Sequence, residues 1–326
     1  MGFIEDELKE VKTLCERVVE GSRLVSCVPT MVRTEIKRTE HKSLVACMQF
    51  PVAYPKSPVL LELKSKFLSD KLLQKLMSVC EEEAKKYLGK AQVIKVLQFL
   101  RKFIDENPLS CCYDEINELR KSLNAEIDEI RLKQKSSSLV LKVINGGYFL
   151  NVKIIVPDHY PLQAIDIHET DTNFPPSFNR HMILQAKEIA RQCVEPPRIK
   201  NPREPEFKPV PSLGKSCSFL IDCIKRLPNE KCQYCKELCF PKNPNLVIID
   251  ENSPRHIERV YCGHLYHQQC LFNYMKAPPF GNKTCHFCGT RISHHKWKLS
   301  DRLAEDRWAH EQARERELAE VEDFFK

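Results

Sequence analysis

Eight cysteine and histidine residues in the last third of the chain constrain its fold most strongly. They form four close pairs, Cys232 with Cys235, Cys262 with His264, His267 with Cys270, and Cys285 with Cys288. Zinc prefers thiolate and imidazole ligands, and a structural zinc site takes four of them in a tetrahedron. The four pairs therefore predict two closed zinc sites, two Zn2+ per chain, in one small module. Such sites have no open position, so we expect the metals to stabilise the fold and to catalyse nothing.

The spacing alone does not decide how the four pairs combine. Neighbouring pairs could share an ion, or alternate pairs could interlace. Cys239 is a spare thiol four residues after the first pair; it could compete with Cys235, although a place in a loop or the core is the simpler interpretation. We expect His286, His294 and His295 not to be ligands.

The other cysteines and the charge indicate a protein of a reducing compartment. Nine of the 16 cysteines stand singly or in apolar settings, where they serve as small core side chains. Without a basic and apolar signal sequence, this usage favours metal binding over disulfides and an intracellular location, in the cytoplasm or nucleus. The chain has no run of 18 apolar residues, so we expect no membrane partner. Its net charge of +7 is spread along the chain and gives nucleic-acid binding little support.

A repeated segment organises the first two thirds of the chain. FPVAYPKSPVLLEL (residues 50–63) and VPDHYPLQAIDIHE (residues 156–169) share an apolar-Pro-x-x-Tyr-Pro pattern followed by a β-like run. The first copy predicts a helix over residues 4–18, strands over 22–28, 31–37, 43–50 and 58–63, and helices over 69–88 and 92–105. Helix, antiparallel strands and covering helices make an α+β domain.

The second copy has a similar order of elements. It predicts a helix over residues 113–135, a hairpin over 137–156 that turns at Asn145-Gly146-Gly147, and closing helices over 179–193 and 216–227. A repeat of this size is typical of a duplicated domain.

Each copy resembles an RWD domain, a relative of the ubiquitin-conjugating fold whose strands lead into a Tyr-Pro turn. The resemblance implies RWD-like domains at residues 1–110 and 111–228. The family pattern is Tyr-Pro-x-x-x-Pro; the first copy has Pro58 one position early, and the second lacks this proline. Neither copy has the His-Pro-Asn segment and nucleophilic cysteine of a conjugating enzyme, so we expect docking domains without catalytic activity.

Residues 231–291 resemble a RING finger with two central histidines, chiefly through the run CGHLYHQQC at residues 262–270. A PHD finger fits the order of pairs poorly. The resemblance implies a RING finger at residues 229–292, followed by a charged helical tail at 293–326. It also implies that Cys232, Cys235, His267 and Cys270 bind one zinc ion, and that Cys262, His264, Cys285 and Cys288 bind a second.

RING fingers recruit a ubiquitin-charged conjugating enzyme and promote ubiquitin transfer to a substrate lysine. Carried over by position, the resemblance implies a docking groove and a basic residue that bridges ubiquitin and the conjugating enzyme: Tyr234, Tyr274, His286, Phe287 and Arg291. Tyr274 has an equally good interpretation as helix packing. Many active members have proline at the position of His286, and Arg291 lies two positions later than their basic residue.

These resemblances imply a RING-type E3 ubiquitin ligase, with a conjugating enzyme, ubiquitin and a protein substrate as partners. The order of the domains is similar to that of RING ligases that carry RWD domains, such as the Fanconi anaemia ligase family. The alternative is a non-catalytic scaffold whose zinc module only mediates protein contacts. In the tail, Trp297, Leu303 and Trp308 could pack beside the zinc module or bind a partner, and a solvated helix is the default.

Overall fold

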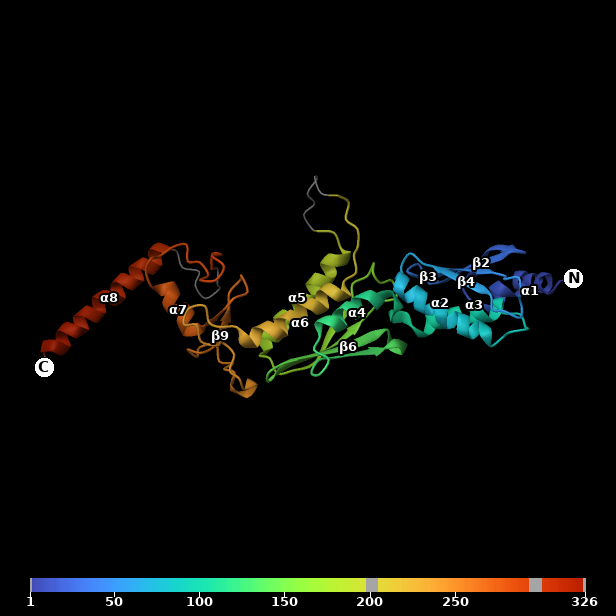
Figure 1. Ribbon diagram of the computed structural model, residues 1–326. Coiled ribbons are helices and arrows are strands. Elements are labelled where there is room, and N and C mark those ends of the chain that lie inside the picture. The colour runs from blue at the N-terminus through green and yellow to red at the C-terminus, as the bar shows by residue number, and fades with distance from the viewer. Residues whose placement is uncertain (1, 198–204, 293–300, 325–326) are drawn as a thin grey trace. The chain divides into compact units, whose positions relative to one another are not determined.

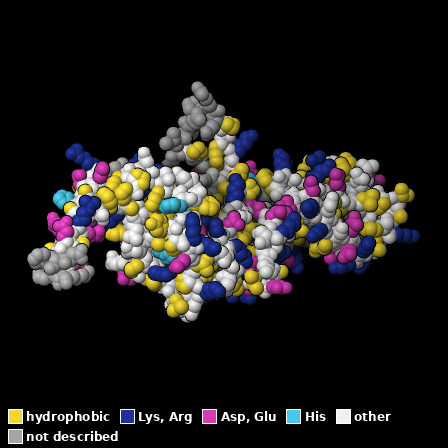
Figure 2. Space-filling model, turned by 60° about the vertical axis from the view of Figure 1, so that its left-hand side comes forward, with side chains coloured by type: hydrophobic (Ala, Val, Ile, Leu, Met, Phe, Trp, Pro, Cys, Tyr) yellow, Lys and Arg dark blue, Asp and Glu magenta, His cyan; other side chains and the backbone are white. Residues whose placement is uncertain are grey.

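The computed structural model describes residues 2–197, 205–292 and 301–324 (Figure 1). The chain forms two compact units. The first contains Met1–Val143, Asn151–Asp171 and Arg180–Ile221, and the second contains Ile144–Leu150, Thr172–Asn179 and Asp222–Lys326. Among the described residues, no helix has the length and apolar character needed to cross a membrane. Lysine and arginine side chains are interspersed with aspartate and glutamate over the face drawn in Figure 2.

The first repeat is a four-stranded sheet with three helices. Its elements are α1 (Phe3–Val18), β1 (Ser22–Val28), β2 (Met31–Thr39), β3 (Lys42–Gln49), β4 (Leu60–Lys64), α2 (Asp70–Lys85) and α3 (Val93–Glu106). The strands pair antiparallel in the order β1-β2-β3-β4. All seven elements match the sequence prediction to within a few residues, so the predicted α+β order is confirmed here.

One face of this sheet is buried against the helices. Along β2, Val32, Thr34 and Ile36 are buried, whereas Arg33 and Lys37 are exposed, as expected for a strand covered on one side. All three helices and strands β2, β3 and β4 contribute side chains to the same hydrophobic core. The predicted helix over residues 4–18 placed Val18 on its apolar face, but Val18 is 44% exposed, and the next residue, Val19, is buried instead.

The second repeat has the same order of sheet and helices, preceded by a short 3-10 turn. Its elements are η1 (Pro108–Cys112), α4 (Tyr113–Ser122), β5 (Glu129–Lys133), η2 (Gln134–Ser136), β6 (Ser138–Asn145), β7 (Tyr148–Ile155), β8 (Asp166–Thr172), α5 (Pro176–Val194) and α6 (Leu213–Arg226). The strands lie in the order β5-β6-β7-β8. In both repeats the peptide bond of the Tyr-Pro pair is cis.

The prediction of one helix over residues 113–135 is wrong. The helix α4 ends at Ser122, and a tight loop follows in which Asp128 accepts a hydrogen bond from the backbone of Asn124 (2.9 Å), whose own side chain accepts one from Glu126. Such side chain–backbone bonds compete with a helix. The next residues form β5, where Ile130 and Leu132 pair with β6. Sheet pairing overrides the helical character of this charged segment.

A buried carboxylate ties three elements together in the first repeat. Glu7 of α1 accepts a hydrogen bond from the hydroxyl of Tyr54, in the Tyr-Pro turn, and one from each of the backbone N–H groups of Gln92 and Val93 (2.8 Å each). Those N–H groups belong to the start of α3. An acceptor with negative charge is favoured there, because the first N–H groups of a helix lack partners within the helix.

The second repeat contains the same arrangement. Glu115 of α4 accepts hydrogen bonds from the hydroxyl of Tyr160 (2.5 Å) and from the backbone N–H of Gly214 at the start of α6 (2.8 Å). The Tyr160 oxygen in turn accepts hydrogen bonds from the N–H groups of Ser212 (3.0 Å) and Leu213 (3.1 Å). First helix, Tyr-Pro turn and last helix are therefore joined by one buried Glu–Tyr pair in each repeat.

The cysteine-rich module lies in the second compact unit. It contains η3 (Leu227–Asn229), η4 (Pro244–Leu246), the antiparallel pair β9 (Ile257–Arg259) and β10 (Leu265–His267), and α7 (Gln268–Lys276). Within this unit Phe240 packs on the rings of Tyr148 (5.4 Å), Phe174 (5.8 Å) and Phe178 (5.1 Å). The Tyr148 hydroxyl donates a hydrogen bond to the carbonyl of Pro241 (2.9 Å).

The tail forms α8 (Asp301–Phe324), a charged helix as predicted. Trp308 is half-buried against Phe280 with ring centres 5.9 Å apart, and Glu311 pairs with Lys276 at 3.6 Å. Leu303 is 42% exposed. The predictions for Trp297, His294 and His295 concern positions outside the described residues.

Candidate metal centres

The eight predicted ligands gather in two groups of four. Within each group the candidate ligand atoms all lie within 4.8 Å of one another. One group contains Cys232, Cys235, His267 and Cys270, and the other contains Cys262, His264, Cys285 and Cys288. The structure thus combines alternate pairs along the chain, a choice that spacing alone had left open and that the RING resemblance implied.

The spacing of the donor atoms suits a tetrahedral zinc site. Zinc bonds of about 2.3 Å to sulfur and about 2.0 Å to nitrogen place tetrahedral S and N ligands about 3.6 Å apart. The Nδ1 atom of His267 lies 3.3 Å from Cys235 Sγ and 3.9 Å from Cys270 Sγ. In the other group His264 Nδ1 lies 3.3 Å from Cys262 Sγ. Both groups could therefore hold a metal ion, and their sulfur and nitrogen donors fit zinc.

Each Cys-x2-Cys pair is shaped by a tight turn that ends in a left-handed residue. The N–H of Lys236 donates to the carbonyl of Cys232, and the N–H of Gly289 donates to that of Cys285, both at 2.9 Å. The backbone φ is +65° at Lys236 and +69° at Gly289. Glycine adopts this conformation without steric cost, whereas a residue with a Cβ does not. At the first turn the Lys236 ammonium donates to the carbonyl of Gln233 (2.7 Å).

The short strand β10 connects the two groups. His264, immediately before β10, belongs to one group, and His267, its last residue, belongs to the other. The backbone N–H of His267 points at Cys232 Sγ (3.4 Å), and Cys270 lies in the first turn of α7. A hydrogen bond from a backbone N–H stabilises a thiolate, as metal binding requires.

Tyr266, between those two histidines, is a residue whose role the sequence interpretation missed. Its side chain is fully buried, and its hydroxyl donates a hydrogen bond to Cys285 Sγ (3.3 Å). The same oxygen accepts one from the backbone N–H of His286 (3.1 Å). Burial raises the pKa of the Tyr266 hydroxyl, so it stays protonated as a donor. The signal in the sequence was the polar hydroxyl of Tyr266, at a position between His264 and His267 where phenylalanine would supply the same ring.

Three of the predicted docking residues come together beside the two groups. The ring of His286 lies 4.3 Å from that of Tyr274 and 5.9 Å from that of Tyr234, and the two tyrosine rings are 6.2 Å apart. We call Tyr234, Tyr274 and His286 the aromatic patch. The Tyr274 hydroxyl also donates to the carbonyl of Thr284 (2.9 Å), so this side chain takes part in packing within the module as well as in the patch. Burial lowers the pKa of the His286 imidazole, which favours the neutral ring.

The other two predicted docking residues lie apart from these ring contacts. Phe287 is 71% exposed, and its ring packs on that of His264 at 4.5 Å. Arg291 is exposed on a backbone bridge that pairs it with Thr284. Phe287 therefore presents an aromatic ring to solvent beside the second group.

The spare thiol of Cys239 is buried against the first group. Its proximity to Cys232 is the main influence that lowers the pKa of the Cys232 thiol and raises that of Cys239 itself. These directions favour the thiolate at Cys232 and the thiol at Cys239. The Cys239 sulfur does not belong to the four atoms that lie within ligand distance of one another.

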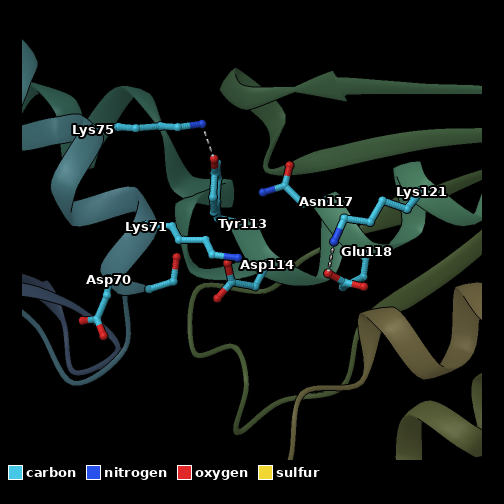
Figure 3. Close-up of a pocket in the computed structure, with 9 residues that line it drawn as sticks. Asp70, Lys71, Lys75, Tyr113, Asp114, Asn117, Glu118 and Lys121 are labelled. Atoms are coloured by element: carbon cyan, nitrogen blue, oxygen red, sulfur yellow. Dashed lines mark hydrogen bonds and ion pairs between the residues drawn. The ribbon is translucent and has the colours of Figure 1, made fainter.

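A separate pocket lies between α2 and α4 in the first unit (Figure 3). Its volume is about 610 Å3, and the Lys75 ammonium crosses it to the hydroxyl of Tyr113 (2.8 Å). Three lysines and three acids line it, among them the ion pair Lys121–Glu118 (2.7 Å). The charges balance, so the pocket has no preference for an anion or a cation.

Comparison with known families identifies the first repeat. Residues 4–104 match the RWD domain family. These residues form an RWD domain. The match covers α1 to α3 and includes the Glu7–Tyr54 pair of the RWD domain. Among curated proteins, none matches the sequence significantly.

Proposed function

We propose that this chain is a zinc-dependent RING-type E3 ubiquitin ligase with two RWD-like domains ahead of its RING. The observation that carries this proposal is the interlacing of two four-ligand groups around one strand, with Tyr234, Tyr274 and His286 gathered beside them. The RWD domain supports it further, since RWD domains commonly bind conjugating enzymes.

The second RWD-like domain is proposed from its structure. Its strand order repeats that of the RWD domain, and Glu115 with Tyr160 occupies the place of Glu7 with Tyr54. We propose that the two domains dock the substrate or help to hold the conjugating enzyme, in the cytoplasm or nucleus.

Bound zinc would supply rigidity to the RING and no open coordination position. The rings of Tyr234, Tyr274 and His286 would then contact the conjugating enzyme, and the exposed ring of Phe287 would add a further contact. Arg291 would donate to carbonyl groups of ubiquitin and the conjugating enzyme, since one guanidinium can serve two acceptors. Catalysis would consist of holding the charged enzyme in the conformation that a lysine attacks, with no covalent intermediate on this chain.

The test is discharge of ubiquitin from a panel of charged conjugating enzymes, with E1, ATP and free lysine, by protein whose zinc content is measured beforehand. At least one enzyme of the panel should discharge faster with this protein present. Phe287→Ala should abolish the acceleration with two zinc ions per chain retained. Tyr261→Ala is the matched control, because Tyr261 is 79% exposed and also adjoins a ligand; it should behave as the natural protein does.

The second candidate is a scaffold that binds partners through the zinc module without promoting transfer. His286 in the place of a proline, and the two-position displacement of Arg291, favour it. Two zinc ions per chain together with no acceleration for any conjugating enzyme would decide for the scaffold. Absence of zinc from the folded chain would contradict both.

A further inference from the structure

Two adjacent thiols lie at the junction between the repeats, far in sequence from the candidate metal groups. Cys111 and Cys112 end the 3-10 turn η1 and immediately precede α4. Their Sγ atoms are 3.7 Å apart, so the side chains point toward each other. Cys112 is buried and Cys111 half-buried, which gives the pair one thiol with access to solvent. The simple interpretation of both as core side chains therefore fits Cys112 only.

The surroundings make the two thiols unequal. The contact between the two Sγ atoms, in which either can donate, is the main influence that lowers the pKa of Cys111, and the Lys42 ammonium lowers it further. The same contact and burial raise the pKa of Cys112. The Cys111 Sγ also lies 3.4 Å from the carbonyl oxygen of Pro108, to which the thiol form donates. Lys42 is itself buried and pairs with Asp158 at 2.9 Å, so its charge is fixed in place. Cys111 is thus the nucleophile of the pair, since it is the thiol that solvent reaches and the thiolate is the reactive form.

The pair does not have the composition of a metal site. Among the described residues, the groups of three or more potential ligands occur only in the module of residues 232–288. Two neighbouring thiols without further ligands have the chemistry of a dithiol, in which one sulfur attacks an oxidant and the other resolves the product.

We propose that Cys111 and Cys112 form a peroxide-reactive dithiol that closes reversibly to a disulfide between adjacent residues. The Cys111 thiolate attacks one oxygen of hydrogen peroxide and becomes a sulfenic acid, while the other oxygen leaves as hydroxide and takes up a proton to form water. Cys112 sulfur then attacks the Cys111 sulfur, and the sulfenic hydroxyl leaves with the Cys112 proton as a second water. Two thiols are oxidised by two electrons, and one peroxide is reduced.

The position of the pair favours reversal. Adjacent Cα atoms are about 3.8 Å apart, which is shorter than the usual span of a disulfide. A disulfide under this constraint is readily reduced by cellular thiols, as labile and regulatory disulfides are. The bond would form at the start of α4, the helix that carries Glu115, so oxidation acts on the backbone beside the Glu115–Tyr160 pair.

The experiment uses the full, zinc-loaded chain exposed to increasing hydrogen peroxide, followed by alkylation with iodoacetamide and digestion with trypsin. Residues 103–120 form one tryptic peptide, and Cys111 and Cys112 are its only cysteines. We expect this peptide to become two hydrogen atoms lighter and to lose both alkylation sites while two zinc ions remain bound. Dithiothreitol should restore both sites. Cys80, buried in α2 with a pKa that burial raises to about 12, is the internal control and should oxidise on the order of tenfold more slowly.

Two variants assign the steps. Cys112→Ser should stop the reaction at the Cys111 sulfenic acid, which dimedone labels, and Cys111→Ser should leave the peptide without dimedone. The proposal is overturned if both thiols stay available until zinc is released, or if Cys111 proceeds to sulfinic acid while Cys112 is still alkylated. These readouts do not involve ubiquitin transfer, so their outcome is independent of the proposed ligase activity.

Discussion

Tyr160 donates a hydrogen bond to Glu115 across 2.5 Å, and its oxygen accepts two backbone N–H groups at the start of α6. Replacing it by phenylalanine removes all of these bonds and leaves their partners buried. Tyr160→Phe should therefore lower the free energy of unfolding by about 1–3 kcal/mol. Urea denaturation would measure this change. Tyr113→Phe is the control, because that hydroxyl is exposed, and its removal should shift the urea midpoint little.

The same carboxylate predicts a specific pH dependence. Burial raises the pKa of Glu115 above the ordinary value of a glutamate. At pH values between the unfolded-state and folded-state pKa of Glu115, the folded state therefore binds more protons than the unfolded state. The contribution of Glu115 to stability is present at low pH and is lost as pH rises through the folded-state pKa. Compared with Glu115→Gln, the natural protein should gain stability as pH is lowered from 7 toward about 4.3, the unfolded value. Urea curves of both proteins at several pH values would show this; parallel dependences would contradict it.

The matched turns of the two Cys-x2-Cys pairs offer a test of backbone strain. Lys236 has φ +65°, and glycine there should stabilise the module by about 1 kcal/mol. Gly289→Ala should destabilise the module by about 1 kcal/mol, because alanine is strained in this left-handed conformation. A Cβ at Gly289 meets no atom within 4 Å, so only the backbone conformation opposes the substitution. Thermal unfolding at fixed zinc concentration compares the two. An unchanged midpoint for both would refute the argument.

The role of Cys239 can be separated from that of a ligand by counting metal. Cys239→Ala should keep two zinc ions per chain, because its thiol stands outside the group of four. Cys235→Ala should weaken the first site and lower the zinc content. If instead both single variants kept two ions and only the double variant lost one, Cys239 would be an interchangeable ligand.

Tyr266→Phe should loosen the second group without removing a ligand. The hydroxyl supports Cys285 from outside the ligand shell, and loss of such support commonly weakens metal binding on the order of tenfold. Transfer of zinc to a colorimetric chelator should be faster by a similar factor. Tyr261→Phe, at an exposed position, should leave the transfer rate unchanged. Equal rates for both variants would show that the Tyr266 hydroxyl does not support the site.

The sequence predicted the elements of the first repeat because their apolar periodicity is regular and local. The segment after Ser122 was assigned wrongly because its acids, lysines and spaced isoleucines suit a helix, and only the pairing of Ile130 and Leu132 with β6 makes it a strand. That pairing depends on tertiary contacts, which no local pattern contains.

At the metal groups, the spacing of cysteine and histidine was sufficient to select all eight residues. The spacing did not decide between neighbouring and alternate pairs, because both satisfy it and the path of β10 separates them; only the RING resemblance implied the alternate groups. The bonds of Tyr266 and the contact of Cys239 with Cys232 depend on side-chain orientation. The sequence showed these residues but not what they touch.

Phe240 packs against Tyr148, Phe174 and Phe178 at the end of the second sheet, only five residues after Cys235. A fragment that starts at the first metal ligand would leave this ring in water. The cysteine-rich region is consequently a poor candidate for exchange between proteins as a ready-made cassette. Any chimaera should therefore carry the strand that supplies Tyr148 together with the cysteine-rich region.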